Sequence, residues 1–512
     1  MLASGRNTYL CIAAAGCVRM YKVSREGGGW RTMETLKEKT AKGLLWGGIN
    51  SFALQVVGLV FGIILARLLS PEDYGMIAMV GVFSAIAGAA QESGFRVALT
   101  NMKHPTHDDY NAVFWFNVIV GALMYGLLYM LAPLLGRFYH NVEVVPLSRF
   151  VLFAVFVSTF GIAQSAYLFR RLKAKQQAKA SIAAVLLSSA VGVVMAYKGC
   201  RYWALATQSL VYVAVNVVMQ WHYSPWRPTL RHVTLRPIAR MFPFSCKLLA
   251  TTIATYVNNN VLNLLLGRFF TAHATGCYSQ ANTWSAKCYN VVMSAMMQVT
   301  LPVLAELQDD EGRQLNAFRK IMRFTAFFSF PLLLGLGLVS QEFIVIALGE
   351  KWLESARLLQ IVCVGGAVLP LSQALSNMVV SNGRSGTYLC ATVALGLLQI
   401  VVLVAMRSLG LTAMVAVYVL INVAWVFVWF VFVHRLTRYT LVAFLRDTVP
   451  FAAAAAAVMV AVHYVTLPIT SLWVLLAARV VLAAALYYAV MRLAGARILA
   501  ECIAFAKNIV KK

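Results

Sequence analysis

The chain has 512 residues, of which 61% are hydrophobic and only 12% are charged, and its mean hydropathy is +0.74. Soluble domains are about half apolar and about a quarter charged, which argues against a soluble enzyme or nucleic-acid-binding protein despite the formal charge of +26. Since a membrane-spanning helix takes about 20 residues, the apolar content suffices for about twelve to fourteen of them. The sequence therefore predicts an all-α polytopic membrane protein.

Residues 1–32 stand apart from the rest. Their apolar stretch of about eight residues is too short to span a bilayer, although a signal peptide or a lipoprotein-like ending at Cys17 is an alternative. From Met33 on, METLKEKTAKG is a short charged and amphipathic lead-in of the kind that precedes a first span. We interpret 1–32 as an over-extended start or a disordered extension, and Met33 as the natural beginning.

After this lead-in, apolar runs of span length recur between short polar breaks. The second and eighth runs are the least apolar, because they carry Glu92, Arg96 and Lys287, and segments this polar usually lie inside a bundle or line a cavity. The fourteen predicted spans are 43–68, 76–99, 112–136, 147–168, 180–197, 202–222, 241–266, 277–300, 322–348, 358–380, 387–406, 409–433, 448–466 and 470–494.

Basic residues gather in alternate connections between these spans. If the N-terminus is cytoplasmic, the basic stretches 170–179, 227–240 and 313–323 all fall on the cytoplasmic side, as the positive-inside rule requires. We therefore expect a multi-pass protein of a bacterial inner membrane with both termini cytoplasmic, and no nucleic-acid partner. No connection exceeds about twenty-five residues, so we expect no soluble domain and no catalytic residues of a glycan-processing membrane enzyme.

An internal repeat predicts how the spans are grouped. ILARLLSPEDYG at the end of the first span matches LLGRFFTAHATG at the end of the seventh, with Arg67 on Arg268 and Gly75 on Gly276. Two copies six spans apart have the same orientation, which implies a pseudo-twofold axis along the membrane normal. The predicted domains are an N-lobe at 33–222, a basic cytoplasmic linker at 223–240, a C-lobe at 241–433, and two further helices with a cytoplasmic tail at 434–512.

The same residues resemble a known family. Five segments are similar to Wzx-like polysaccharide flippases of the multidrug/oligosaccharidyl-lipid/polysaccharide (MOP) superfamily. They are ARLLSPEDYG, ESGF and DDYNAVFWFN in the first lobe, and GCYSQANTWSAKCYNVV and TLPVLAELQDDEGRQLNAFRK in the second. The resemblance covers Thr35 to about Arg446. It implies a MATE-like fold of two pseudo-symmetric six-helix lobes plus two C-terminal helices.

The resemblance also implies a function. The cargo would be an undecaprenyl-pyrophosphate-linked oligosaccharide moved by alternating access for O-antigen, capsule or exopolysaccharide synthesis. Membrane lipids, and a polysaccharide polymerase and chain-length regulator, would be the partners. No ATP-binding GxxxxGK[ST] loop is present in the sequence, so no cofactor is expected. The energy would come from an ion gradient of H⁺ or Na⁺, from a partner, or from downstream consumption of the product.

A pyrophosphate in a membrane needs a hydrated, cationic cavity. Each candidate cation could instead have a structural role. Lys247 can extend its side chain to the lipid headgroups, Arg96 can pair with Glu92, and the arginines at the outer ends of the first and seventh spans can bind helix-end carbonyls. Glu92 is the candidate for ion coupling. The candidate cations are Lys287, Lys247, Arg96, Arg268 and Arg67.

Intramembrane amides form a second candidate group. Such side chains either hydrogen-bond between helices or bind sugar hydroxyls, and the sequence favours neither. The polar candidates are Asn258, Asn259, Asn260, Asn263, Gln55 and Asn50.

Two alternatives concern what such a protein would bind. His104, His107, Asp108 and Asp109 resemble a metal site, but we interpret Thr106 and the two acids as a helix start and expect no metal. A MATE-type multidrug exporter would require an acidic residue in its first span, and the first span of this chain contains none. A lipid II-type flippase would use similar cations.

Overall fold

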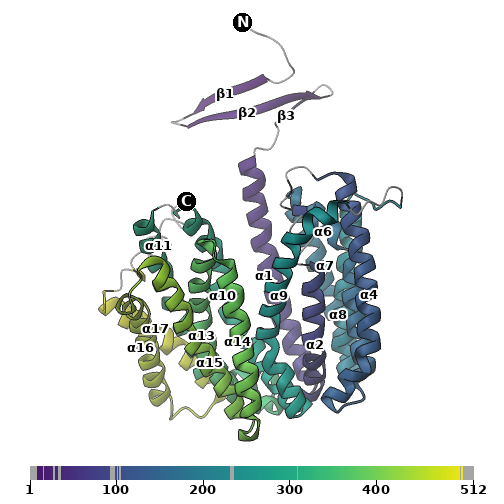
Figure 1. Ribbon diagram of the computed structural model, residues 1–512. Helices are drawn as coiled ribbons and strands as arrows, with labels where there is room; N and C mark the ends of the chain where they lie inside the picture. Colours follow the sequence, from purple (N-terminus) through teal and green to yellow (C-terminus); the bar gives the residue numbers. More distant parts are fainter. Residues whose placement is uncertain are drawn as a thin grey trace.

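The computed structural model describes residues 8–14, 17–26, 29–32, 36–92, 99, 100, 102, 105–230, 236–307, 310–495, 498 and 499. Long helices run roughly side by side, and both ends of the chain lie on the upper side of Figure 1. We call this side the terminal end and the opposite side the far end.

A small sheet precedes the helices. It is antiparallel, in the order β1 (Thr8–Ala14), β2 (Cys17–Glu26), β3 (Gly29–Thr32), and Figure 1 places it beyond the start of the first helix. The sequence did not predict these strands. Met33 as the natural start remains a prediction.

Each predicted span overlaps a helix, or a pair of helices, of the structure. In the first lobe, the fourth span is a pair of helices bent by 44°. The N-lobe contains α1 (Leu36–Leu68), α2 (Pro71–Glu92), α4 (His107–Tyr139), the pair α5 (Val144–Thr159) and α6 (Ile162–Arg170), α7 (Ala174–Tyr197) and α8 (Tyr202–Tyr223).

The second lobe repeats this order and is followed by the two appended helices. The predicted span 322–348 is divided at Val339 into a long helix and a short one. The helices are α9 (Arg236–Phe269), α10 (Ala272–Glu306), α11 (Glu311–Leu338), α12 (Ser340–Leu348), α13 (Leu353–Ser381), α14 (Ser385–Ala405), α15 (Leu411–Thr437), α16 (Leu441–Val465) and α17 (Leu472–Leu493), with short 3-10 helices at Glu350–Trp352 and Arg407–Leu409.

Several helices begin earlier than their apolar runs. α4 starts at His107 because Thr106 and Asp109 form a capping box, with reciprocal bonds between each side chain and the other's backbone N–H. This confirms the helix-start interpretation of these residues. α9 starts at Arg236, which shortens the linker predicted at 223–240, since Pro237 is tolerated in a first helical turn.

Not every helix is equally apolar. Within the described residues, ten helices are long and apolar enough to cross a membrane, or eleven if the bent pair is one span. The ten do not include α2, α9 and α10. Fourteen crossings therefore remain a prediction, and these three helices are the ones that join the lobes, as described below.

The two lobes have separate cores, and α9 belongs to both. Near its start, Ile238 packs with Tyr110, Phe114 and Trp226 in the N-lobe, whereas Leu266 near its end packs in the large C-lobe cluster. That cluster also includes residues of α16 and α17, so the appended helices pack on the C-lobe. The lobe boundary predicted at residue 241 thus falls inside a helix shared by two cores.

A buried ion pair fixes α17 against α12. Arg479 donates to Glu342 Oε1 at 2.7 Å and to the carbonyl oxygen of Leu338 at 3.1 Å, and both charged side chains are less than a tenth exposed. Because both its charge and its donors are paired, we interpret Arg479 as a residue that stabilises the fold.

We predict that Glu342→Ala leaves Arg479 charged and unpaired, which costs about 3–5 kcal/mol for a buried pair. Thermal unfolding of the purified protein should show a clearly lower midpoint. Glu350→Ala, which removes an exposed acid of the same lobe, should leave the midpoint near that of the wild type. Equal midpoints for all three proteins would contradict the role of the pair.

Candidate functional site: the lobe interface and two polar cavities

The lobes touch where α2 and α10 begin, through two symmetry-related glycines. A Cβ added to Gly75 would lie 1.8 Å from the carbonyl oxygen of Ala272, and one added to Gly276 would lie 1.8 Å from that of Pro71. Only glycine fits at such a distance. Because the repeat pairs Gly75 with Gly276, the contact is reciprocal, as a pseudo-twofold axis requires.

The two repeat arginines make a second reciprocal contact at the far end. Arg67 of α1 donates to the carbonyl oxygens of Ile346 and Ala347 at 2.5 and 2.8 Å, at the end of α12 in the C-lobe. Arg268 of α9 donates to the carbonyl oxygen of Phe138 at 2.6 Å, at the end of α4 in the N-lobe. Both cations, proposed from sequence as cavity residues, thus lie on carbonyls of the opposite lobe and line neither polar cavity described below.

Further polar contacts join the two lobes at the far end, and we call these and the arginine contacts together the closure. Trp352 Nε1 and Lys351 Nζ donate to the last carbonyls of α1, at 2.9 Å to Ala66 and 2.6 Å to Leu69. His273 lies between Glu72 of the N-lobe, at 2.7 Å, and Glu354 of the C-lobe, at 3.2 Å. The far end is therefore held shut by hydrogen bonds and an ionisable bridge.

His273, Glu354 and the buried Cys277 could also hold a metal ion, since their ligand atoms lie within 4.8 Å of one another. Both ring nitrogens of His273 already have a carboxylate partner, so we interpret the group as part of the closure. By contrast, His107 accepts a hydrogen bond from Trp226, at 3.0 Å. The sequence did not predict this group, because its members come together only where the lobes meet.

Lys287 lies deeper in the interface. Its Nζ is 3.3 Å from the carbonyl oxygen of Gly58 on α1 and 4.4 Å from the centre of the Trp284 ring. Among the described residues, no carboxylate lies within 4.0 Å of it. Intramembrane ionisable residues are candidates for functional sites, and the anionic guest expected at Lys287 remains a prediction.

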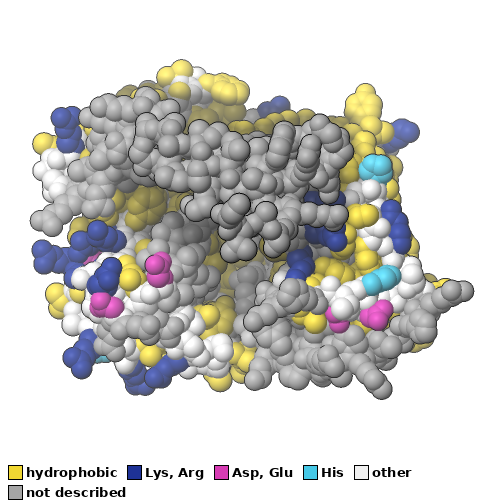
Figure 2. Space-filling model, turned by 90° about the horizontal axis from the view of Figure 1, so that it is seen from above, with side chains coloured by type: hydrophobic (Ala, Val, Ile, Leu, Met, Phe, Trp, Pro, Cys, Tyr) yellow, Lys and Arg dark blue, Asp and Glu magenta, His cyan; other side chains and the backbone are white. Residues whose placement is uncertain are grey.

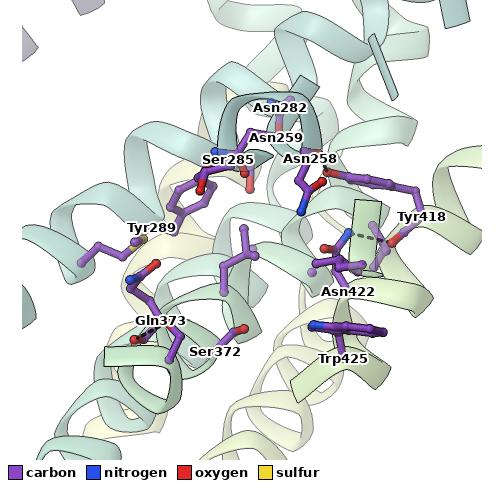
Figure 3. A pocket seen from close by; sticks show the side chains of 18 of the residues that line it. Asn258, Asn259, Asn282, Ser285, Tyr289, Ser372, Gln373, Tyr418, Asn422 and Trp425 are labelled. Atoms are coloured by element: carbon purple, nitrogen blue, oxygen red, sulfur yellow. Dashed lines mark hydrogen bonds between the residues drawn. The ribbon is translucent and has the colours of Figure 1, made fainter. Parts of the chain in front are cut away.

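A polar cavity of about 420 Å³ lies inside the C-lobe, between α9, α10, α13, α14 and α15. Figure 3 shows Tyr289 and Gln373 on one side and Tyr418, Asn422 and Trp425 on the other. No charged residue is among those that line the cavity in the described part of the chain. Its size falls within the range of about 300–1,000 Å³ typical of ligand pockets.

The N-lobe contains a counterpart of about 340 Å³. It is lined by Tyr212 and Asn216 from VYVAVNVV in α8, which matches VYVLINVA in α15, the source of Tyr418 and Asn422. This second repeat was not predicted, although the sixth spans of the two lobes align on these residues in the sequence.

The structure divides the remaining candidates. Asn258, Asn259 and Asn260 line the C-lobe cavity, and Asn50 lines the N-lobe cavity. Neither Asn263, which is buried, nor Gln55, which is exposed, is among the lining residues. Arg96 and the side chains of Lys247 and Glu92 lie outside the described residues.

Comparisons with known proteins identify the family. The family model described as polysaccharide biosynthesis protein matches residues 64–357. The lipopolysaccharide biosynthesis protein WzxC of Escherichia coli K12 is 27% identical over 68% of this chain and 71% of its own length. The teichuronic acid biosynthesis protein TuaB of Bacillus subtilis is 22% identical over 69% and 73%.

Solved structures share the fold at low sequence identity. The lipid II flippase MurJ superposes with a TM-score of 0.69 at 13% identity, covering 88% of this chain and 99% of its own. An inward-facing MATE transporter of the MOP superfamily superposes with a TM-score of 0.56 at 14% identity, covering 80% and 98%. The MATE-like polytopic fold predicted from sequence is thereby confirmed, and the chain, a multi-pass membrane protein, belongs to the family of polysaccharide biosynthesis proteins.

Proposed function

We propose that this protein is a flippase that moves undecaprenyl-pyrophosphate-linked oligosaccharides across the bacterial inner membrane for surface polysaccharide synthesis. The observation that carries the proposal is Lys287, an intramembrane cation without a described counter-ion at the interface of the two lobes. The family, and the lipopolysaccharide and teichuronic acid proteins to which the chain is similar, support a cargo for cell-surface glycans.

Lys287 suits the pyrophosphate of such a cargo. Its ammonium group makes one hydrogen bond, to Gly58, and can donate two more. In this proposal a lipid-linked anion enters between the lobes, while its polyprenyl chain stays in the bilayer.

Alternating access follows from the way the lobes are joined. The described inter-lobe hydrogen bonds other than that of Lys287 are at the far end. Each contributes only about 0.5–3 kcal/mol net, with the larger values for the charged side chains, so the closure can be released. At the terminal end, Figure 2 shows a depression between the two halves.

We place the terminal end in the cytoplasm. Lys and Arg side chains surround the rim of this end in Figure 2, as the positive-inside rule expects of a cytoplasmic face. Both termini are then cytoplasmic, and the cargo is loaded there. H⁺ or Na⁺ supplies the energy in this proposal, with Glu92 as the coupling site; no cofactor and no enzymatic step is required, and a polymerase and chain-length regulator take over the product.

A multidrug exporter of the same fold is less well supported. Organic cations require acids, and the described lining residues of both polar cavities contain none. A lipid II-type flippase is the second candidate, favoured by the superposition on MurJ, and it differs only in the glycan carried.

The first prediction concerns the gene. Its deletion should abolish the surface polymer and cause a lipid-linked oligosaccharide to accumulate, because translocation is blocked after synthesis of the intermediate. Complementation from Met33 should restore export if residues 1–32 are dispensable. Unchanged surface glycan with altered sensitivity to cationic drugs would instead support the exporter.

The second prediction concerns Lys287. Lys287→Ala should lower export about tenfold or more, since charged hydrogen bonds contribute about 1.5–3 kcal/mol, whereas Lys287→Arg should retain part of the activity. Export is measured as surface polymer per molecule of membrane-inserted protein. Lys198→Ala, an exposed lysine at the far end, serves as the control. Normal export by Lys287→Ala would overturn the assignment.

The third prediction concerns the closure. The double variant Arg67→Ala, Arg268→Ala should open the far end more often and expose the buried Cys277 to a membrane-impermeant maleimide. Labelling is measured by peptide mass spectrometry in a Cys200→Ser background. Arg137→Ala, which removes an exposed arginine of the same end, should not increase it. Equal labelling of all variants would contradict the proposed role of the two arginines.

A further inference from the structure

We propose that the C-lobe cavity is a separate subsite for neutral sugar units of the cargo, while Lys287 takes its phosphate. This inference rests on the proposed function and divides the cargo between two places in the same lobe. α10 separates them: Ser285 and Tyr289 face the cavity, whereas Lys287 reaches α1 at Gly58.

The lining of the cavity matches the chemistry of a sugar. Each sugar hydroxyl both donates and accepts hydrogen bonds, and an amide side chain offers both functions. Asn258, Asn282, Asn422 and Gln373 supply amides around the space, and the absence of charge from its described lining makes it a poor site for pyrophosphate. The neutral amides therefore favour hydroxyl groups over ions.

Aromatic rings complete the match. Trp425 and Tyr289 stand on opposite sides of the cavity in Figure 3, and Tyr388 and Trp429 stack at 5.6 Å in its wall. A pyranose ring presents a face of C–H groups that packs against an aromatic ring, while its hydroxyls point outward to polar partners. A lining of amides and rings without charges thus fits a carbohydrate better than a lipid chain or an organic cation.

One donor in the lining has no partner. Trp425 Nε1 is a buried atom without a hydrogen bond to the described protein. Buried donors without partners are unfavourable, which indicates that a guest or ordered water satisfies them. Gly366 lets α13 approach α10 closely at the cavity wall, because a Cβ there would lie 2.6 Å from the hydroxyl oxygen of Ser285.

The amides are held in position by neighbours behind them. Asn422 accepts from Gln399 at 3.2 Å and donates to the carbonyl oxygen of Tyr418 at 2.8 Å, and Asn258 donates to that of Thr392 at 2.6 Å. Such support fixes the geometry before a ligand arrives. The N-lobe repeats the pair as Tyr212 and Asn216 beside its own cavity, so the duplication preserved the lining residues as well as the helices.

The cavity also has access to the interface. Asn259 on α9 and Asn290 on α10 line its edge and are exposed, and both helices contact α2 of the other lobe. A glycan attached to a phosphate at Lys287 can therefore enter between α9 and α10.

The test uses purified full-length protein and two probes. One is the oligosaccharide released by mild acid from the lipid-linked intermediate that accumulates in the deletion strain; the other is inorganic pyrophosphate. Asn422→Ala should weaken oligosaccharide binding about tenfold and leave pyrophosphate binding unchanged, and Lys287→Ala should do the reverse. Binding is measured by calorimetry and by tryptophan fluorescence.

Leu420→Ala, which truncates an exposed side chain two residues from Asn422, is the matched control and should bind both probes like the wild type. Thermal unfolding of each variant separates lost binding from lost folding, and Asn422→Gln should restore part of the affinity. If Asn422→Ala binds the oligosaccharide as well as the wild type, or if the wild type does not bind it, the subsite is overturned and the flippase stands. If the deletion strain accumulates no lipid-linked intermediate, the proposed function itself fails.

Discussion

The close approach of α2 and α10 at their first turns is the constraint on which the rest of the architecture depends. Gly75 and Gly276 let each helix start against a carbonyl oxygen of the other, so the two lobes meet at a fixed point on their common axis. Around this point lie the arginine contacts and the His273 bridge. A larger residue at either glycine would separate the lobes where they must close.

The distribution of polar groups follows from this arrangement. Charged side chains that have counter-ions or carbonyl partners stabilise the fold. Arg479 joins α17 to α12, and Arg67 and Arg268 join the two lobes at the far end. Lys287 alone among the cations proposed from sequence and described with side chains lies in mid-interface without an acid. Uncharged amides fill the lobe interiors. The cation Lys287 thus faces the interface, whereas the described lining of the two polar cavities is uncharged.

Much of the fold could be predicted because membrane spans and positive charges follow simple rules. The repeat around Arg67 and Arg268 identified the symmetry, and the cap at Thr106 was visible in the sequence. Partners distant along the chain could not be predicted: the sequence offered Arg67 as a cargo contact, while the structure places it on Ile346 and Ala347. Asn258 and Asn263 looked alike, and only the packing of α14 and α15 shows which one borders a cavity.

The position of α9 in two cores has a mechanical consequence. Its first turns are anchored by Ile238 in one lobe and its last turns by Leu266 in the other, so a rotation of the lobes must bend the helix between these anchors or pull one of them out. The segment between them contains Asn258, Asn259 and Asn260, which border the C-lobe cavity. A ligand in that cavity would therefore change the free energy of bending α9, and with it the free energy of the rotation, without contact at either end of the transport path.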